Sequence, residues 1–442
     1  MMRAGDAREP AMRLLRLAYA SGVLLAAGPA MPALGTELFD ACASAAASQY
    51  EIGYSEIGKD RWQIDTAVAT ESCKAALAEA PESSQIKAWL GRAYDVAGDM
   101  HSALPLLEDA ATGGNPLALT LYGDLLIVGS AVPQDMTRGA SLLQQAVDLG
   151  FAPAQDSLGL SYDYGEGVEP DHAQAARLYR LAANQGLPRA AANLARMYAQ
   201  GLGPDEDIAA ASAWYRRAAD GGDAGAAYNL GKLHELGQLA EPDYEAAAAL
   251  YQMAADRGYA LGMNALGYLK QHGYGTKPDL EGAASLYQQA ADLGLAQAQV
   301  NLALLHEDGT GVAQDYAKAL VLYRQASDSG SADAAANLGL LYLNGAGGAP
   351  DYDKALQFTQ QSAAAYNPVG LNNLGHLYEN GYGVQIDLDQ ALSLYQQAAD
   401  IGYQPGADNH ARLQAAMQSP GDEGEPPVNP NLKVYPPSKL DN

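Results

Sequence analysis

The sequence predicts an all-α protein, a solenoid of stacked two-helix units, on three observations. Glycine, aspartate and tyrosine each recur in register every 36 residues. The chain has 442 residues, which is too long for one ordinary core. A pair of short helices cannot bury its own apolar face, so units of this size must stack on their neighbours.

A glycine and an aspartate mark the two ends of the loop inside each unit. The glycine ends the first helix, because it adopts the left-handed conformation that a helix end needs. The aspartate caps the second helix by accepting hydrogen bonds from its free N–H groups. The glycines are Gly129, Gly165, Gly201, Gly237, Gly273, Gly309, Gly345 and Gly381, and the aspartates are Asp135, Asp171, Asp207, Asp243, Asp279, Asp315, Asp351 and Asp387.

Small and aromatic residues share one face of each second helix. An alanine four residues after the aspartate lets helices approach closely, and a tyrosine four residues further on fills the gap toward the next unit. Leu143 and Thr359 replace this tyrosine in two units. The tyrosines are Tyr179, Tyr215, Tyr251, Tyr287, Tyr323 and Tyr395.

Two further glycine positions predict tight packing and tight turns. Leu-Gly pairs inside the first helix, such as Leu266-Gly267, predict a close helix crossing, since an interior glycine otherwise costs up to about 1 kcal/mol. Another glycine series closes each unit and is interrupted only by Tyr366. Its members are Gly150, Gly186, Gly222, Gly258, Gly294, Gly330 and Gly402.

In these repeated glycine, aspartate, alanine and tyrosine residues, the chain resembles the Sel1-like repeat family, which is related to tetratricopeptide repeats. One good match runs through Asn301-Leu302-Ala303, Gly309-Thr310-Gly311-Val312 and Asp315-Tyr316-Ala317-Lys318-Ala319 to Tyr323. The resemblance covers residues 116–404, and we assign the solenoid to residues 116–416. It implies a right-handed α-solenoid of Sel1-like, tetratricopeptide-like repeats.

Residues before the solenoid fall into three segments. Residues 84–115 resemble a tetratricopeptide-type unit, and residues 36–83 resemble the N-terminal helical cap of secreted bacterial proteins of this kind. Residues 1–35 are expected to be an export signal, because Arg13 and Arg16 precede an apolar run that ends in small residues. Met12 is the better initiator, since it places both arginines at the front of the signal. The run is too short for a membrane span.

The only two cysteines, Cys42 and Cys73, lie in the presumed cap. In an oxidising compartment we expect them to form one disulfide. Two buried thiols are the alternative, which becomes the favoured one if the chain is not exported. We therefore expect a periplasmic or secreted protein.

The end of the chain and its charge are less specific. Residues 417–442 are rich in Pro, Gly, Asp and Glu, which predicts a disordered tail. The formal net charge is −26, which disfavours binding to nucleic acid and favours a basic partner. A solvated acidic surface explains the same charge without a partner.

The sequence holds no recognisable catalytic or metal-binding pattern. None of the seven histidines has the spacing of a metal site, and no Ser/His/Asp or Cys/His set is present. His234 and His306 occupy a slot where other units carry tyrosine, so we interpret them as packing residues. We expect no cofactor, no metal and no enzymatic activity.

A mixed polar and aromatic set is the candidate for partner binding. By analogy with tetratricopeptide repeats, positions two before and two after the first-helix leucine face the concave groove. Such a mixture suits recognition of a peptide or loop, but solvated positions would vary in the same way. The set includes Tyr228, Lys232, Asn264, Tyr268, Asn372 and His376. A regular asparagine one residue before the leucine favours a structural hydrogen bond.

Three functions remain open from the sequence. The resemblance implies first a non-catalytic protein-interaction scaffold or regulator of the bacterial envelope, whose partner is an envelope or membrane component. A glycan or small-ligand binder is the second possibility. The third is a β-lactamase-like hydrolase, as in cysteine-rich relatives, but those carry a disulfide in each repeat, and the repeats here from Pro116 onward contain no cysteine.

Overall fold

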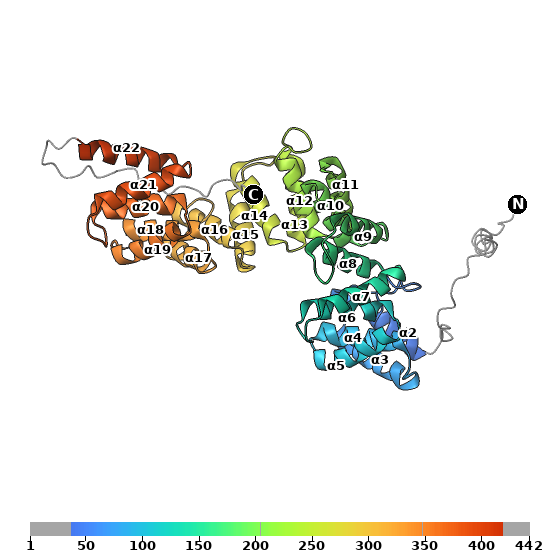
Figure 1. Cartoon of the computed structure of the whole chain (residues 1–442). Helices are drawn as coiled ribbons and strands as arrows, with labels where there is room; N and C mark the ends of the chain where they lie inside the picture. Colours follow the sequence, from blue (N-terminus) through green and yellow to red (C-terminus); the bar gives the residue numbers. More distant parts are fainter. Residues whose placement is uncertain (1–36, 204, 347, 419–442) are drawn as a thin grey trace. The chain divides into compact units, whose positions relative to one another are not determined.

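The computed structural model describes residues 37–203, 205–346 and 348–418. Every regular element in these ranges is a helix, so the all-α solenoid prediction is confirmed (Figure 1). The chain divides into two compact units, Met1–Ala154 and Gln155–Asn442. The expected export signal lies outside the described residues. So does the predicted tail, except residues 417 and 418, which belong to the last helix.

In the first unit, each helix up to residue 148 packs on the next one along the chain. The core includes Trp89 and Leu107, which are fully buried. The elements are α2 (Glu37–Ala46), η1 (Arg61–Gln63), α3 (Thr66–Glu79), α4 (Ser84–Ala97), α5 (Met100–Thr112), α6 (Pro116–Val128), α7 (Met136–Asp148) and the start of α8 (Ala152–Tyr164).

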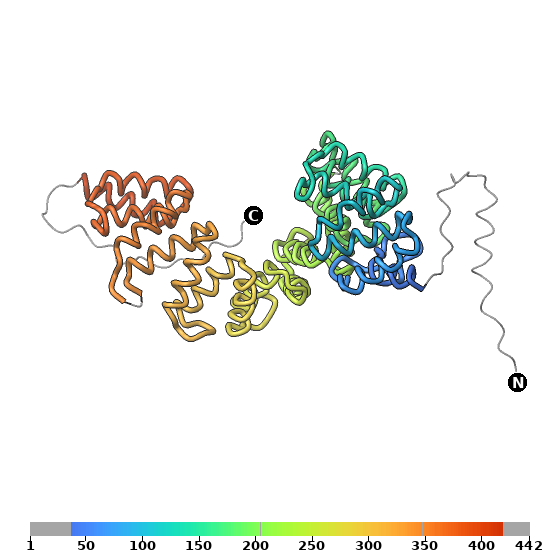
Figure 2. Tube along the Cα trace, turned by 90° about the horizontal axis from the view of Figure 1, so that it is seen from below, coloured from blue at the N-terminus to red at the C-terminus, as the bar shows by residue number. Residues whose placement is uncertain are grey.

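The second unit continues with pairs of helices of nearly constant length, which follow one another side by side (Figures 1 and 2). The helices are α9 (His172–Asn184), α10 (Pro188–Gln200), α11 (Ile208–Asp220), α12 (Ala224–Glu235), α13 (Tyr244–Asp256), α14 (Ala260–His272), α15 (Leu280–Asp292), α16 (Ala296–Asp308), α17 (Tyr316–Asp328), α18 (Ala332–Asn344), α19 (Tyr352–Ala364), α20 (Pro368–Asn380), α21 (Leu388–Asp400) and α22 (Gln404–Gln418).

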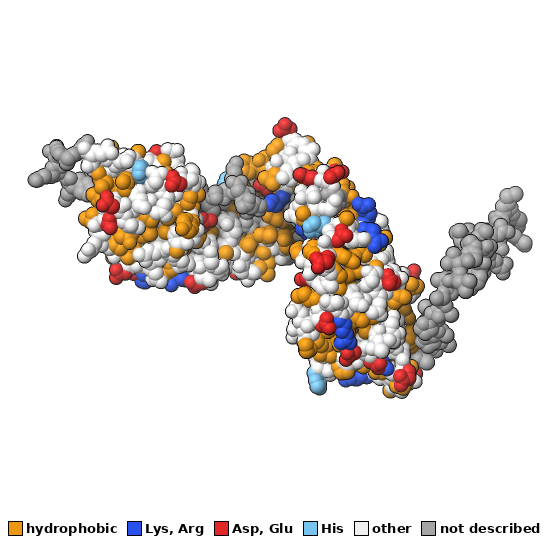
Figure 3. Space-filling view, viewed as in Figure 1, with side chains coloured by type: hydrophobic (Ala, Val, Ile, Leu, Met, Phe, Trp, Pro, Cys, Tyr) orange, Lys and Arg blue, Asp and Glu red, His pale blue; other side chains and the backbone are white. Residues whose placement is uncertain are grey.

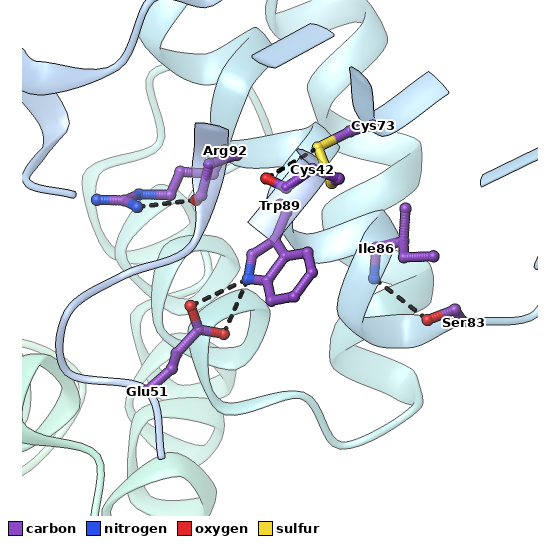
Figure 4. Close-up of a disulfide and its surroundings, with 8 residues drawn as sticks. Cys42, Glu51, Cys73, Ser83, Ile86, Trp89 and Arg92 are labelled. Atoms are coloured by element: carbon purple, nitrogen blue, oxygen red, sulfur yellow. Dashed lines mark hydrogen bonds between the residues drawn. A yellow bond between two sulfur atoms is a disulfide. The ribbon is translucent and has the colours of Figure 1, made fainter. Parts of the chain in front are cut away.

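A disulfide fastens the N-terminal cap, as predicted. Cys42 of α2 is bonded to Cys73 of α3, and both are fully buried. Beside it, the indole Nε1 of Trp89 donates to the two carboxylate oxygens of Glu51, at 3.2 and 3.0 Å (Figure 4). Arg92 donates from Nη1 to the last carbonyl of α2 at 2.9 Å. The segment between α2 and α3 is thereby held against α4.

The loop aspartates act as predicted. All eight are N-caps whose carboxylates accept from backbone N–H groups of the first turn. In Asp315, for example, Oδ1 accepts from the N–H of Lys318 at 3.0 Å. The glycines that precede them all have positive φ, between 63° and 75°. Each repeat thus begins its second helix with its own hydrogen-bond acceptor.

The glycine inside the first helix gives room to the repeated tyrosine of the second helix in the same repeat. A Cβ built on Gly231 would lie 2.6 Å from the ring of Tyr251, and one on Gly267 would lie 2.8 Å from Tyr287. Real Cβ atoms do not come so close, so the predicted close crossing is confirmed. The tyrosine rings fill the space and are fully buried in both repeats.

The second glycine of the Gly-x-Gly loop has a role that only the structure shows. Gly275 lies against the first residue of α13, in the preceding repeat, and a Cβ there would be 2.3 Å from the backbone carbonyl of Tyr244. Gly311 and Gly383 lie in the same way against Leu280 and Tyr352. This glycine therefore sets how closely neighbouring repeats stack.

Tyr366 is the one non-glycine residue with positive φ in the described part of the chain, at 56°. It occupies a slot that glycine fills in the other units, and its side chain is 71% exposed. Left-handed backbone costs an L-residue roughly 1–2 kcal/mol. We expect Tyr366→Gly to raise the free energy of unfolding by about 1 kcal/mol in urea titrations, and Tyr366→Asn to raise it less. A loss of stability in the glycine variant would contradict this account.

Candidate binding site

Several first helices of the second unit contact the first helix of the next repeat directly, as α12 does α14 and α18 does α20. Side chains that stand at one slot therefore meet those of the next repeat. The six predicted partner-binding residues all lie on this row of first helices in the second unit. Their neighbours decide which of them remain accessible.

Two of the six are asparagines used in packing between repeats. Asn264 is 3% exposed and accepts a hydrogen bond at 2.9 Å from Asn301 of the following repeat. Asn372 is 6% exposed and accepts one at 2.8 Å from Asn409. Asn301 belongs to the regular series for which a structural hydrogen bond was predicted. Asn373 belongs to the same series, but the residue 37 positions earlier is Ala336, which offers no side-chain acceptor. The Nδ2 atom of Asn373 is buried without an acceptor.

Tyr228 and His376 are also buried in this structure. Tyr228 is 8% exposed, with its ring centroid 5.6 Å from those of both Tyr251 and Tyr259. His376 is 4% exposed, and burial lowers its pKa to about 4, so the ring is neutral at physiological pH. Both side chains would have to move to contact a partner.

Lys232 and Tyr268 are half-buried, so part of each side chain is accessible to solvent. Tyr268 also belongs to a cluster of aromatic rings. Its centroid lies 4.2 Å from that of His272 and 6.2 Å from that of Tyr274. Tyr274 also stacks on Tyr244 at 5.1 Å. We call Tyr244, Tyr268, His272 and Tyr274 the aromatic cluster. His272 and Tyr274 are exposed, and the other two rings are half-buried.

Sequence reasoning missed three members of the aromatic cluster. Tyr244 opens a second helix, and Tyr274 lies thirty residues later, between the two loop glycines of the next repeat. The same spacing joins Tyr352 and Tyr382, whose rings stack at 4.8 Å. Two tyrosines thirty residues apart, the second in a Gly-Tyr-Gly loop, are therefore a signal that sequence analysis could have used.

The repeated tyrosines add a polar ladder beneath the first helices. Five of the six hydroxyls donate to the side chain sixteen residues earlier in the chain, and the exception is Tyr215, where that residue is Ala199. Tyr251 donates to Glu235 at 2.5 Å, and Tyr287 donates to the neutral Gln271 at 2.8 Å. Tyr395 donates to Glu379 at 2.7 Å. Burial, and then the neighbouring carboxylate, raise the pKa of Tyr251 far above its usual value.

An arginine of the next repeat joins this ladder at two places. Arg412 donates to Glu379 at 2.7 Å, and Arg196 donates to Asp163. Burial works to raise the pKa of Glu379, but the hydrogen bonds from Arg412 and Tyr395 outweigh it, so the pKa lies below its usual value. Glu379 is therefore ionised, and both carboxylates accept hydrogen bonds from a tyrosine and from an arginine.

Charge and metal chemistry give no further candidate. In the view of Figure 3, acidic and basic side chains are scattered among uncharged ones. Across residues 37–203, 205–346 and 348–418, no group of three or more His, Cys, Asp or Glu side chains could hold a metal ion. No helix within those ranges is long and apolar enough to cross a membrane.

Comparisons with known proteins agree with this architecture. No curated protein sequence matches the chain. A Sel1 repeat protein from Oxalobacter formigenes has 26% identity and a TM-score of 0.54, over 71% of this chain and 89% of its own. The protective antigen c5321 of uropathogenic Escherichia coli, which displays an SLR fold, has 26% identity and a TM-score of 0.56, over 79% of this chain and 83% of its own.

The family model for the Sel1 repeat matches eight consecutive segments, more than half of the chain. Each segment begins at a first helix and ends after the glycine or tyrosine that closes the unit. The segments are 116–151, 152–187, 188–223, 224–259, 260–295, 296–331, 332–367 and 368–403. On the repeat period, the helix pairs and this match, the chain belongs to the Sel1 repeat family.

Proposed function

We propose that this protein is a non-catalytic scaffold of the bacterial envelope, which holds a partner protein against the first helices of its second unit. The observation that carries the proposal is the aromatic cluster, in which His272 and Tyr274 are exposed and the other two rings are half-buried. Aromatic side chains are enriched where proteins bind one another.

Lys232 supports the same surface. It stands at the slot that Arg196 and Arg412 fill, but the residue thirty-three positions earlier is Ala199 and not an acid. Within the described part of the chain no carboxylate forms an ion pair with Lys232. A lysine without an internal acceptor, one repeat before Tyr268, suits a carboxylate or carbonyl of a bound chain.

Location outside the cytoplasm rests on two further points. A disulfide between Cys42 and Cys73 persists in oxidising compartments. The structural relative from uropathogenic Escherichia coli is described as a protective antigen, which fits a protein exposed beyond the cytoplasm. Together with the expected export signal, these points support an envelope role.

Crosslinking in intact cells, followed by affinity capture and mass spectrometry, tests the proposal. We expect one dominant envelope or membrane protein, reduced at least about tenfold in the Lys232→Ala/Tyr268→Ala variant, as for loss of hot-spot side chains. The matched control, Lys318→Ala/Tyr366→Ala, removes the same residue types elsewhere in the second unit and should capture normally. A known envelope complex serves as the positive control for crosslinking. If that complex is captured but this protein is recovered alone, the scaffold proposal is contradicted, and a glycan or small ligand is favoured.

A further inference from the structure

Two Gly-x-Gly loops of the second unit carry a tyrosine that stacks on the preceding repeat. Tyr274 stacks on Tyr244 with ring centroids 5.1 Å apart, and Tyr382 stacks on Tyr352 at 4.8 Å. We call these the two tyrosine pairs. Tyr274 and Tyr352 are 37% and 39% exposed, and the other two rings are half-buried. Each pair therefore presents aromatic surface to solvent beside its loop.

Contact between neighbouring repeats does not require these rings. In the repeat that follows Tyr274, Thr310 stands in the loop, and Leu280 opens the second helix before it. Gly311 still lies against Leu280, where a built Cβ would be 2.5 Å from the backbone oxygen. The loop thus packs as closely on the preceding repeat without aromatic side chains. Packing between repeats therefore does not explain the two tyrosine pairs.

The chain leaves the last helix close to one of these pairs. Gln418, the last residue of α22, stands thirty-six residues after Tyr382 and so continues the slot of the loop tyrosines by one repeat. The first helices α14, α16, α18, α20 and α22 follow one another along the second unit (Figure 1). α20 contacts α22 directly, and contacting helices lie about 8–10 Å apart. Residues 419–442 therefore start about one helix spacing from the Tyr352–Tyr382 pair.

The prolines of residues 419–442 have a spacing that matches the two tyrosine pairs. Pro426-Pro427 and Pro436-Pro437 stand ten residues apart. A polyproline II chain rises about 3.1 Å per residue, so ten residues span about 31 Å. The tyrosine pairs belong to loops three repeats apart, which corresponds to about 30 Å at one helix spacing per repeat.

We propose that residues 419–442 bind back onto the solenoid of their own chain. Pro426-Pro427 contacts the Tyr352–Tyr382 pair, and Pro436-Pro437 contacts the Tyr244–Tyr274 pair. Proline-rich segments bind aromatic surfaces of proteins, because the polyproline II form is already extended and loses little conformational entropy on binding. Tyrosine rings suit this contact, since they offer a large apolar face at a low entropic cost.

Reach and charge both support binding within one chain. Eighteen residues separate Gln418 from Pro436, and they span about 56 Å in the polyproline II form. Four repeats of about 10 Å each separate Gln418 from the loop of Tyr274, so the segment is long enough. Lys433 and Lys439 flank the second proline pair, and the acidic solenoid attracts them.

Binding of this segment has a consequence for the aromatic cluster. Tyr274 belongs both to the cluster and to the second tyrosine pair, so the bound segment limits the access of a partner to Tyr268, whose centroid is 6.2 Å from that of Tyr274. Only this consequence rests on the proposed scaffold function.

Limited digestion of the full folded chain with trypsin tests the proposal. Trypsin cuts a segment in proportion to the fraction of time that the segment is unbound. The cut after Lys433, between the two proline pairs, is followed by mass spectrometry and compared with the same cut in a synthetic peptide of residues 419–442. We expect the full chain to be cut at least about tenfold more slowly than the peptide.

Two variants of the solenoid use side chains that the chain already carries at these slots. Tyr274→Thr/Tyr382→Thr copies the loop of Thr310, and it should bring the rate of cutting close to that of the peptide. Tyr316→Leu is the matched control. Tyr316 shares the slot of Tyr244 and Tyr352, but the residue thirty positions later is Ala346, so no ring pair is lost. This control should be cut as slowly as the wild type.

Variants of the segment itself leave every solenoid residue unchanged. Pro436→Ala/Pro437→Ala should speed the cut after Lys433, relative to a peptide with the same two changes. Pro430→Ala removes a proline outside both pairs and should leave the slow rate unchanged.

Each remaining outcome decides against the inference in a different way. Equal rates for the chain and the peptide overturn it, as does slow cutting that Tyr274→Thr/Tyr382→Thr leaves unchanged. A rate that falls as the protein concentration rises assigns the segment to a second copy and overturns binding within one chain. A chain that captures a partner through Lys232 and Tyr268, but whose segment is cut freely, overturns this inference and leaves the scaffold proposal standing.

Discussion

Gly275→Ala should lower the free energy of unfolding of the second unit by about 3–4 kcal/mol. The residue has φ of 63°, which costs an L-residue roughly 1–2 kcal/mol. The new Cβ would also lie 2.3 Å from the backbone of Tyr244, and overpacking of this kind costs typically about 1–3 kcal/mol. Urea unfolding followed by far-UV circular dichroism measures the loss.

Gly258→Ala is the matched control for this prediction. Gly258 has φ of 79°, but a Cβ there would meet nothing within 4 Å. Its substitution should lower the free energy of unfolding by about 1–2 kcal/mol, the cost of a left-handed backbone conformation alone. If the two variants lose the same stability, the contact between the Gly-x-Gly loop and the preceding repeat does not limit how closely repeats stack.

Removal of the Cys42–Cys73 disulfide should cost the first unit about 3–4 kcal/mol. The bond closes a loop with a sequence separation of 31, and the lost constraint on the unfolded chain accounts for this magnitude. The double variant Cys42→Ala/Cys73→Ala should shift the unfolding midpoint, followed by the fluorescence of the buried Trp89. Reductant should destabilise the wild type to the same extent and leave the double variant unchanged.

If reductant also destabilises the double variant, the loss of stability in the wild type does not come from the disulfide. A loss below about 1 kcal/mol in the wild type would mean that the contacts of Glu51 and Arg92 already hold the cap in place without the covalent bond. The structure favours the larger value, because those contacts fasten the segment between α2 and α3 while the disulfide joins the helices themselves.

The sequence by itself determined the period, the helix pairs, the caps and the buried tyrosines. These features depend on residues close to one another in the chain. Asp315 caps α17 through an N–H three residues later, and Gly309 ends α16 by its own backbone conformation. Local chemistry repeated eight times leaves a pattern that can be read without coordinates.

Only the tertiary structure decided which first-helix side chains remain available. Asn264 and Asn372 were among the predicted binding residues, but both are buried, and each accepts a hydrogen bond from an asparagine 37 residues later. The aromatic cluster likewise joins Tyr244 to Tyr274 across a repeat boundary. Such contacts depend on how closely neighbouring repeats stack, and residue spacing within one repeat does not specify that distance.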